Sequence, residues 1–161
     1  MILSTHAVVG GAIASLIPSH PLLAIAAAFA SHFALDAIPH WDYSLHSIAV
    51  GKGADNRRLQ FNRGILIDLI KIGFDASAGL ALALWLFSTL GSIPIVAVCA
   101  CAAMLPDPLQ FLHSVLPREP LSTLQHIHSW MHSKRKLTWR LGVSSQIAFT
   151  TAVVAATSIL R

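Results

Sequence analysis

Five stretches of apolar residues, separated by polar breaks, follow one another along this chain. They cover residues 5–17, 22–38, 65–90, 93–105 and 141–160. The third and fifth are long enough to cross a hydrocarbon core of about 30 Å as helices, whereas the first and fourth would need a tilted or thinned membrane. The breaks at residues 18–21 and 91–94 contain proline or glycine, which favours tight turns between antiparallel helices. The pattern therefore predicts an all-α integral membrane bundle of about five transmembrane helices.

The two longer connections, residues 41–63 and 106–140, hold most of the basic side chains. These are Lys52, Arg57, Arg58, Arg63, Arg118, Lys134, Arg135, Lys136 and Arg140. Because Lys and Arg concentrate in cytoplasmic loops, we expect both connections and the N-terminus to face the cytoplasm. Within the second connection, residues 121–134 are apolar along part of one helical surface. They predict an amphipathic helix that lies at the cytoplasmic interface.

The composition agrees with a single membrane-embedded domain over residues 1–161. Hydrophobic residues make up 55% of the chain and charged residues 11%, with a formal net charge of +4. This is more apolar than an ordinary soluble domain, so we expect an integral protein of the cytoplasmic (inner) membrane with lipids as its partners. No phosphate-binding loop or nucleic-acid motif is present, so we expect no nucleic-acid partner. The oligomeric state is left open.

Nine histidines are the anomaly in this composition, and the most informative segment is residues 31–40. His32, Asp36 and His40 are spaced i, i+4 and i+8, which brings all three to one face of a helix. Imidazole and carboxylate both bind metals, and among alanines they are costly to bury unless they are paired or coordinated. A hydrogen-bonded His/Asp pair between two helices is the alternative. Pro39 disturbs the preceding turn, so His40 is expected beyond the helix.

Other polar residues fall on the same predicted side of the membrane. His6 opens the first helix, with Gly10 one turn later leaving room beside its ring, and Asp107 follows the fourth helix. His128 and His132 share one face of the amphipathic helix at i, i+4 spacing. A hairpin topology brings these segments together, so the predicted metal ligands are His6, His32, Asp36, His40, Asp107, His128 and His132.

Two further carboxylates, Asp68 and Asp75, share a face near the beginning of the third helix. Ionisable groups within a membrane are often functional, so we consider Asp68 and Asp75 as catalytic candidates that orient a water molecule as general base. An ion-pair network with Lys71 on the same helix is an equal alternative. Asp107 is a third candidate for the base.

Four short motifs carry a resemblance to a known family. They are Thr-His-Ala-Val-Val-Gly at residues 5–10, Ser-His-Phe-Ala-Leu-Asp at 31–36, Leu-Pro-Asp at 105–107 and His-Ser-Trp-Met-His at 128–132. They resemble the membrane-bound metal-dependent hydrolase family, the YdjM-like group, of which this chain would be a divergent member. Its Ser-His-x-x-x-Asp element precedes Pro-Asp, and Leu109 replaces a second Asp. The resemblance implies metal-site roles for His6, His32, Asp36 and Asp107.

The main hypothesis is a membrane-bound hydrolase with a divalent metal, expected to be zinc, at the cytoplasmic interface. A phosphoester or lipid headgroup is the expected substrate class, since the site would face headgroups. A metal or proton carrier and a non-catalytic scaffold with paired His and Asp groups are the alternatives. Coordinates distinguish the scaffold from the metal site. Four or more of the named groups around one point favour a metal.

Overall fold

A computed structural model describes residues 1–45 and 63–161, and within these ranges the chain forms seven α-helices. The basic residues Lys52, Arg57 and Arg58, which contributed to the predicted orientation, lie outside the described residues. The helices are α1 (Leu3–Leu16), α2 (Pro21–Asp36), α3 (Arg63–Phe87), α4 (Ile93–Met104), α5 (Pro106–Val115), α6 (Leu121–Met131) and α7 (Trp139–Leu160). The predicted all-α class is confirmed.

The five apolar segments correspond to α1, α2, α3, α4 and α7, with ends that differ from the expected ones by a few residues. The predicted amphipathic helix over residues 121–134 forms as α6. The helix α5 was not expected, because residues 106–120 were assigned to a connection. Pro106 opens this helix at its first turn, where proline needs no N–H partner.

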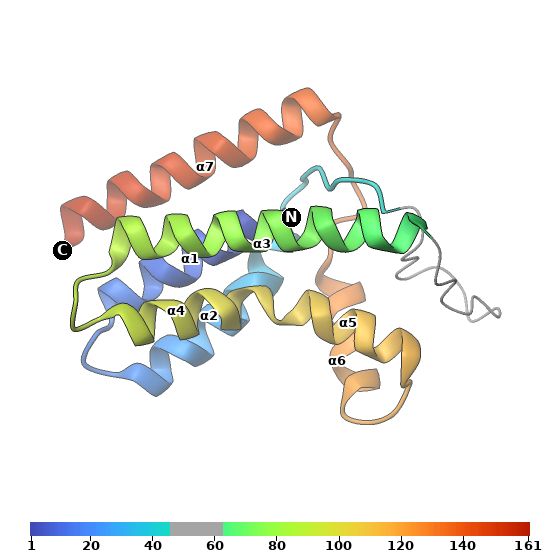
Figure 1. Ribbon diagram of the computed structural model, residues 1–161, viewed down its shortest axis with the longest axis horizontal. Helices are drawn as coiled ribbons and strands as arrows, with labels where there is room; N and C mark the ends of the chain where they lie inside the picture. Colours follow the sequence, from blue (N-terminus) through green and yellow to red (C-terminus); the bar gives the residue numbers. More distant parts are fainter. Residues whose placement is uncertain (46–62) are drawn as a thin grey trace.

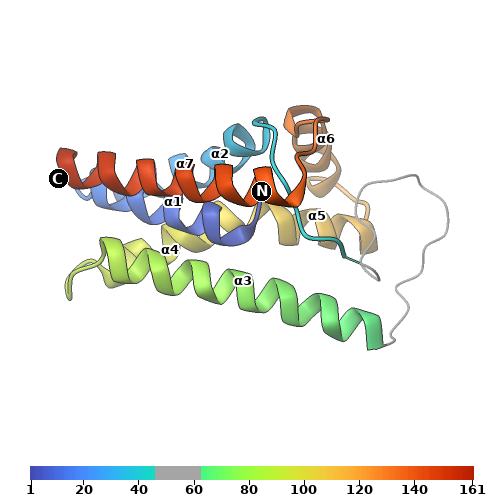
Figure 2. The same ribbon diagram turned by 90° about the horizontal axis from the view of Figure 1, so that it is seen from above.

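Helix α1 is the centre of the packing. It contacts α2, α3, α4 and α7, and its buried side chains include Ala7, Val8 and Ala12. Figure 2 shows α3 along one side of the body and α7 along the other, with α1 between them. The helices α5 and α6 lie together at the end of the body away from the C-terminus (Figure 1).

Two glycines allow the neighbours of α1 to approach closely. A Cβ atom at Gly10 would lie 2.4 Å from the carbonyl oxygen of Cys99 on α4, and a Cβ atom at Gly79 of α3 would lie 2.4 Å from Ser4 Cα. Both distances are far below van der Waals contact, so only glycine fits. Small residues at such crossings let helix backbones pack directly, as is common in membrane bundles.

By length and composition, one helix in the described residues, α7, is suited to cross a membrane. The helices α4 and α5 meet at a bend of 47° and would count as a second such element if they form one broken span. The helices α1 and α2 are apolar but shorter.

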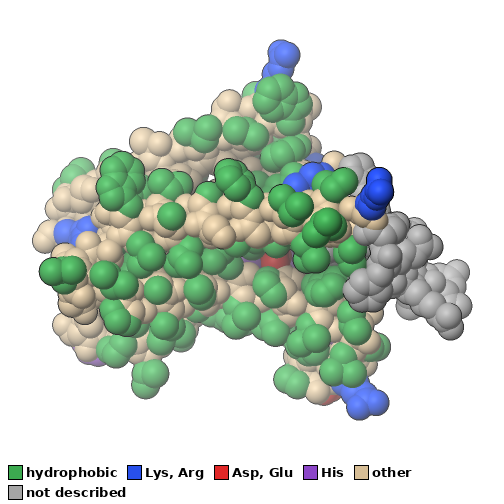
Figure 3. Space-filling view, in the orientation of Figure 1, with side chains coloured by type: hydrophobic (Ala, Val, Ile, Leu, Met, Phe, Trp, Pro, Cys, Tyr) green, Lys and Arg blue, Asp and Glu red, His purple; other side chains and the backbone are tan. Residues whose placement is uncertain are grey.

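Large hydrophobic side chains are also exposed along the outer helices. Phe74 and Trp85 on α3 are 77% and 79% exposed, and Ile159 on α7 is 83% exposed. Figure 3 shows hydrophobic side chains spread over this face, while most of the visible Lys and Arg side chains lie toward the end that carries α5, α6 and the beginning of α3. The face shown in Figure 3 is therefore apolar along the helices and basic near one end.

Candidate metal centre

The carboxylate of Asp36, the last residue of α2, is the centre of the polar cluster and is 1% exposed. Five imidazole rings surround it, each directing its Nε2 atom toward a carboxylate oxygen. The Nε2 atoms lie 3.3 Å (His6), 3.2 Å (His32), 3.9 Å (His40), 3.2 Å (His128) and 3.9 Å (His132) from the nearer Asp36 oxygen. All seven predicted ligands therefore meet here, because Asp107 Oδ1 lies 3.4 Å from His32 Nε2.

Four helices position these groups. The ring of His6 on α1 stacks on His32 of α2, with ring centroids 4.0 Å apart, and both rings are fully buried. Asp107 comes from the first turn of α5 and His128 from α6. The i, i+4 spacing of His32 and Asp36 predicted their shared face, and it is observed.

His40 reaches the cluster by a different route. As Pro39 indicated, it lies beyond α2, which ends at Asp36. The chain from Asp36 to His40 runs beside the segment that follows α6: the Ser133 N–H donates to the Asp36 carbonyl at 2.7 Å and the Leu137 N–H to the His40 carbonyl at 3.0 Å. These backbone bonds hold His40 as a buried member of the cluster.

Backbone carbonyls fix the orientation of three of the rings. The Nδ1 atom of His32 lies 2.8 Å from the Ala103 carbonyl, that of His40 lies 2.7 Å from the Ile38 carbonyl, and that of His132 lies 3.1 Å from the Ser133 carbonyl. A carbonyl can only accept, so each Nδ1 carries the hydrogen. In a neutral ring the Nε2 lone pair then faces the carboxylate, which is unfavourable unless a cation lies between them.

The buried nitrogen atoms give the same indication. Within the described part of the chain, both ring nitrogens of His6 and the Nε2 atom of His32 have no hydrogen-bond partner. Buried polar atoms without partners are rare and call for an explanation such as an ion. A histidine that donates Nδ1–H to a carbonyl and offers Nε2 to a metal is the usual arrangement in metal sites.

Three of the distances between ligand atoms are close to those around a tetrahedral zinc ion. Two ligands that each lie about 2.0–2.1 Å from such an ion are about 3.3–3.4 Å apart. His32 and His128 are each 3.2 Å from Asp36 Oδ2, and Asp107 Oδ1 is 3.4 Å from His32 and 3.8 Å from His128. One ligand atom from each of these four residues lies within 4.8 Å of the others. The criterion that favours a metal over a paired scaffold is met.

The loop after α2 adds a carboxylate that was not among the predicted ligands, Asp42. Its Oδ1 atom lies 3.2 Å from His40 Nε2 and 3.2 Å from the Met1 amino nitrogen, which also contacts Asp36 Oδ1. Burial raises the pKa of Asp42, but the hydrogen bond with His40 and the Met1 charge outweigh it and hold that pKa well below its usual range. Burial lowers the pKa of His132 despite the nearby Asp36 charge, which favours the neutral ring that binds metals.

The two catalytic candidates on α3 lie outside the groups of converging metal-ligand atoms found in the described residues. Asp75 accepts hydrogen bonds from the backbone N–H groups of Leu3 at 2.7 Å and Ser4 at 3.2 Å. It therefore supplies acceptors for the first turn of α1, where N–H groups lack partners within the helix. Asp68 is fully buried on α3. Their role as general bases stays a prediction.

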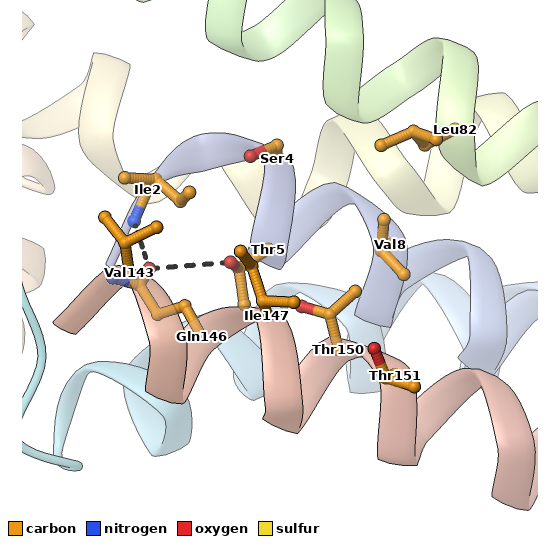
Figure 4. A pocket seen from close by; sticks show the side chains of 10 residues that line it. All are labelled: Ile2, Ser4, Thr5, Val8, Leu82, Val143, Gln146, Ile147, Thr150 and Thr151. Atoms are coloured by element: carbon orange, nitrogen blue, oxygen red, sulfur yellow. Dashed lines mark hydrogen bonds between the residues drawn. The ribbon is translucent and has the colours of Figure 1, made fainter. Parts of the chain in front are cut away.

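Gln146 on α7 is a buried polar residue that the sequence pattern did not single out. Its Oε1 atom accepts from the Ile2 N–H at 3.0 Å and the Thr5 hydroxyl at 3.5 Å, and its Nε2 donates to the Trp41 carbonyl at 2.9 Å. Figure 4 shows Gln146 at a cleft of about 200 Å³ whose lining comes from α7, α3 and the N-terminal part of the chain. Gln146 thus ties α7 to α1 and to the loop that carries Asp42. A lone amide in an apolar helix is the signal that identifies such a tie.

Comparison with protein-family models, with curated proteins and with solved structures found no significant match to this chain.

Proposed function

We propose that this protein is a membrane-bound, metal-dependent hydrolase whose zinc ion is held by His32, Asp36, Asp107 and His128. The observation that carries the proposal is the convergence of these four ligand atoms within 4.8 Å of one another in a buried cluster. The His32 ring adds to this support, because its Nδ1 atom is held by a backbone carbonyl and its Nε2 atom has no hydrogen-bond partner within the described residues. Membership of the YdjM-like family is part of the proposal and rests on the four sequence motifs.

A bound zinc ion would supply a Lewis acid and a source of nucleophile at neutral pH. The residues of the chain exclude bulk water from one side of the site, since His32, Asp36 and His128 are all buried. The side chain of Asp107 is 34% exposed, so the site opens to solvent at the beginning of α5. A substrate would enter there, beside Asp107.

The substrate class we propose is a phosphoester, with a lipid headgroup as the first candidate. Support comes from the exposed hydrophobic side chains along α3 and α7, which suit a lipid environment, and from the basic residues near the cluster. Lys134, Arg135 and Lys136 follow α6 directly, and such bases meet anionic headgroups at the cytoplasmic surface of a membrane. In this arrangement five helices lie in the bilayer, α6 lies at its cytoplasmic interface, and the N-terminus and the site face the cytoplasm.

The test combines elemental analysis of the detergent-purified protein with a screen of phosphoester substrates in mixed micelles. We expect at least one zinc ion per chain, hydrolysis of a phospholipid or a chromogenic phosphoester, and loss of both metal and activity after chelation. The variant His128→Ala should bind zinc at least 100-fold more weakly. The matched control is His126→Ala, because His126 lies two residues away on the same helix and is exposed.

Protein that contains no divalent ion, and that binds none when zinc is added, contradicts the proposal. Zinc binding without hydrolysis of any phosphoester contradicts the enzyme assignment and favours the carrier alternative, which proteoliposome transport assays then address. Extraction from membranes by carbonate, without detergent, contradicts the integral membrane arrangement.

A further inference from the structure

The two oxygens of the Asp36 carboxylate face two different sets of groups. Oδ2 lies 3.2 Å from both His32 Nε2 and His128 Nε2, which are ligands of the proposed zinc ion. Oδ1 lies 3.3 Å from His6 Nε2 and 3.9 Å from His40 Nε2 and contacts the Met1 amino group, while His132 Nε2 lies 3.9 Å from Oδ2. An ionised carboxylate has lone pairs on both oxygens, so each oxygen is able to bind its own cation.

We propose that a second divalent cation binds beside the first, held by Asp36, His40 and His132, with Asp42 as a further ligand. One ligand atom from each of Asp36, His40 and His132 lies within 4.8 Å of the others. Asp36 belongs to both groups of ligand atoms and bridges the two cations. This inference rests on the proposed function and extends its metal site from one ion to two.

The orientation of the two histidines carries the argument. Nδ1 of His40 donates to the Ile38 carbonyl at 2.7 Å and Nδ1 of His132 donates to the Ser133 carbonyl at 3.1 Å. In their neutral form both rings therefore present Nε2 lone pairs to the space around Asp36, and His40 then gives up its hydrogen bond to Asp42. The ring centroids of His40 and His132 are 4.8 Å apart. His40 is 2% exposed, so its position is fixed by the interior and not by solvent. One buried and one half-buried imidazole, together with a carboxylate, form a cation site in the same way as the first group.

The wider spacing distinguishes this second site from the first. His40 Nε2 and His132 Nε2 each lie 3.9 Å from an Asp36 oxygen. That separation exceeds the edge of about 3.3–3.4 Å expected around a tetrahedral zinc ion. An octahedral shell has a still shorter edge, about 3 Å at metal–ligand distances of about 2.1 Å, so the His40 and His132 side chains would have to move toward Asp36 when a cation binds. Asp42 Oδ1, 3.2 Å from His40 Nε2, supplies the additional oxygen.

One divalent cation and the Met1 amino group together balance the three carboxylates of the cluster, so a second cation would have to displace that amino group. The carboxylates of Asp36, Asp42 and Asp107 lie beside histidine rings that can be neutral. One divalent ion offsets two of the three negative charges. The Met1 amino group between Asp36 and Asp42 offsets the third charge in the described arrangement. The alternative to a second ion is therefore this amino group alone, and the number of bound ions distinguishes the two.

Two cations at one carboxylate suit a phosphoryl group. Two-metal sites bind the oxygens of a phosphoester and stabilise charge on both sides of the bond that breaks. The second site thus makes a phosphoester a better fit than a carboxylic ester or an amide, since a phosphoryl group offers several charged oxygens.

The experiment counts ions on the metal-free, full-length protein in detergent, with Mn²⁺ as the probe. We expect two Mn²⁺ ions per chain by elemental analysis and an exchange-coupled signal in electron paramagnetic resonance. The variants His40→Ala and His132→Ala should each retain one ion and lose the coupled signal, and His126→Ala should retain both. If His40→Ala does not fold, His132→Ala carries the test, because His132 is half-buried and follows the end of α6.

One ion per chain in the wild-type protein, with no coupled signal, overturns the second site and leaves the proposed function intact. No ion at all overturns both. Two ions retained in both His40→Ala and His132→Ala overturn the ligand assignment.

Discussion

Asp36 and Asp75 are both carboxylates among apolar helices, yet they receive very different partners. Asp36 is surrounded by imidazole nitrogens from α1, α2, α6 and the loop after α2. Asp75 accepts hydrogen bonds from the backbone N–H groups of Leu3 and Ser4 and from the Tyr43 hydroxyl. The partners of Asp75 all donate hydrogen bonds, whereas neutral imidazoles that present Nε2 lone pairs to Asp36 favour a cation beside it, and the Met1 amino group is such a cation. The chemistry of the partners, more than the carboxylate itself, distinguishes Asp36 as a candidate metal ligand from Asp75, which links two helices.

The largest effect is expected from Asp36→Asn. The amide keeps the size of the side chain but removes the charge on which both proposed cations depend. We expect metal affinity to fall by more than about 100-fold, beyond the usual cost of losing an outer partner of a metal ligand. Isothermal titration with Zn²⁺ measures the change, and Asp75→Asn is the matched control. Equal affinities in the two variants would remove the distinction between the two carboxylates.

A smaller and different effect is expected from Asp75→Ala. The substitution leaves the N–H groups of Leu3 and Ser4 without their acceptor, which we expect to cost about 1–3 kcal/mol in the free energy of unfolding. Metal stoichiometry should not change. Denaturant titration in detergent, paired with elemental analysis, separates the two readouts. Loss of bound metal with unchanged stability would instead give Asp75 a role at the site.

Gly79→Ala tests the packing of α1 against α3, the contact beside which the Asp75 hydrogen bonds form. A Cβ atom there would lie 2.4 Å from Ser4 Cα and would push α1 away from α3, beside the Asp75 hydrogen bonds. Crowding of this kind costs about 1–3 kcal/mol, partly offset by about 1 kcal/mol of helix propensity gained by replacing glycine. We expect a net loss of about 1 kcal/mol in a thermal or denaturant melt.

The matched control for that variant is Gly73→Ala, six residues earlier on α3, where a Cβ atom would meet nothing within 4 Å. It should stabilise the protein by up to about 1 kcal/mol. If both glycine variants shift stability in the same direction, the close approach of α1 to α3 is not what Gly79 provides.

Local spacing predicted the parts of the site that depend on one helix. His32 and Asp36 share a face because they are four residues apart, and the same spacing brought His128 and His132 together. Hairpin topology predicted that Asp107 and His6 would join them. The helix α5 was missed, although Pro106 at a first helical position is a recognised beginning, because residues 106–120 also contain the loop-like prolines Pro108 and Pro117.

The remaining features depend on contacts that leave no pattern in the sequence. The carbonyl that orients His32 belongs to Ala103, a residue of α4 that is chemically silent as a side chain. His40 enters the cluster through backbone pairing with the segment after α6, so its position depends on two segments almost a hundred residues apart. The hydrogen bonds of Asp75 arise only once α1 packs against α3. Each of these is set by tertiary packing and not by local periodicity.

The carbonyls that hold the rings have a consequence for how this protein can diverge over evolution. The main chain at Ile38, Ala103 and Ser133 orients His40, His32 and His132, so the side chains at these three positions take no part in that task. Related sequences are then free to vary at Ile38 and Ser133 while the His40 and His132 rings keep their orientation. Ala103 has less freedom, because it packs against Gly10: a Cβ atom added at Gly10 would lie 2.9 Å from the Cβ atom of Ala103. A family of such proteins would thus share its imidazoles and its small residues and little else around them.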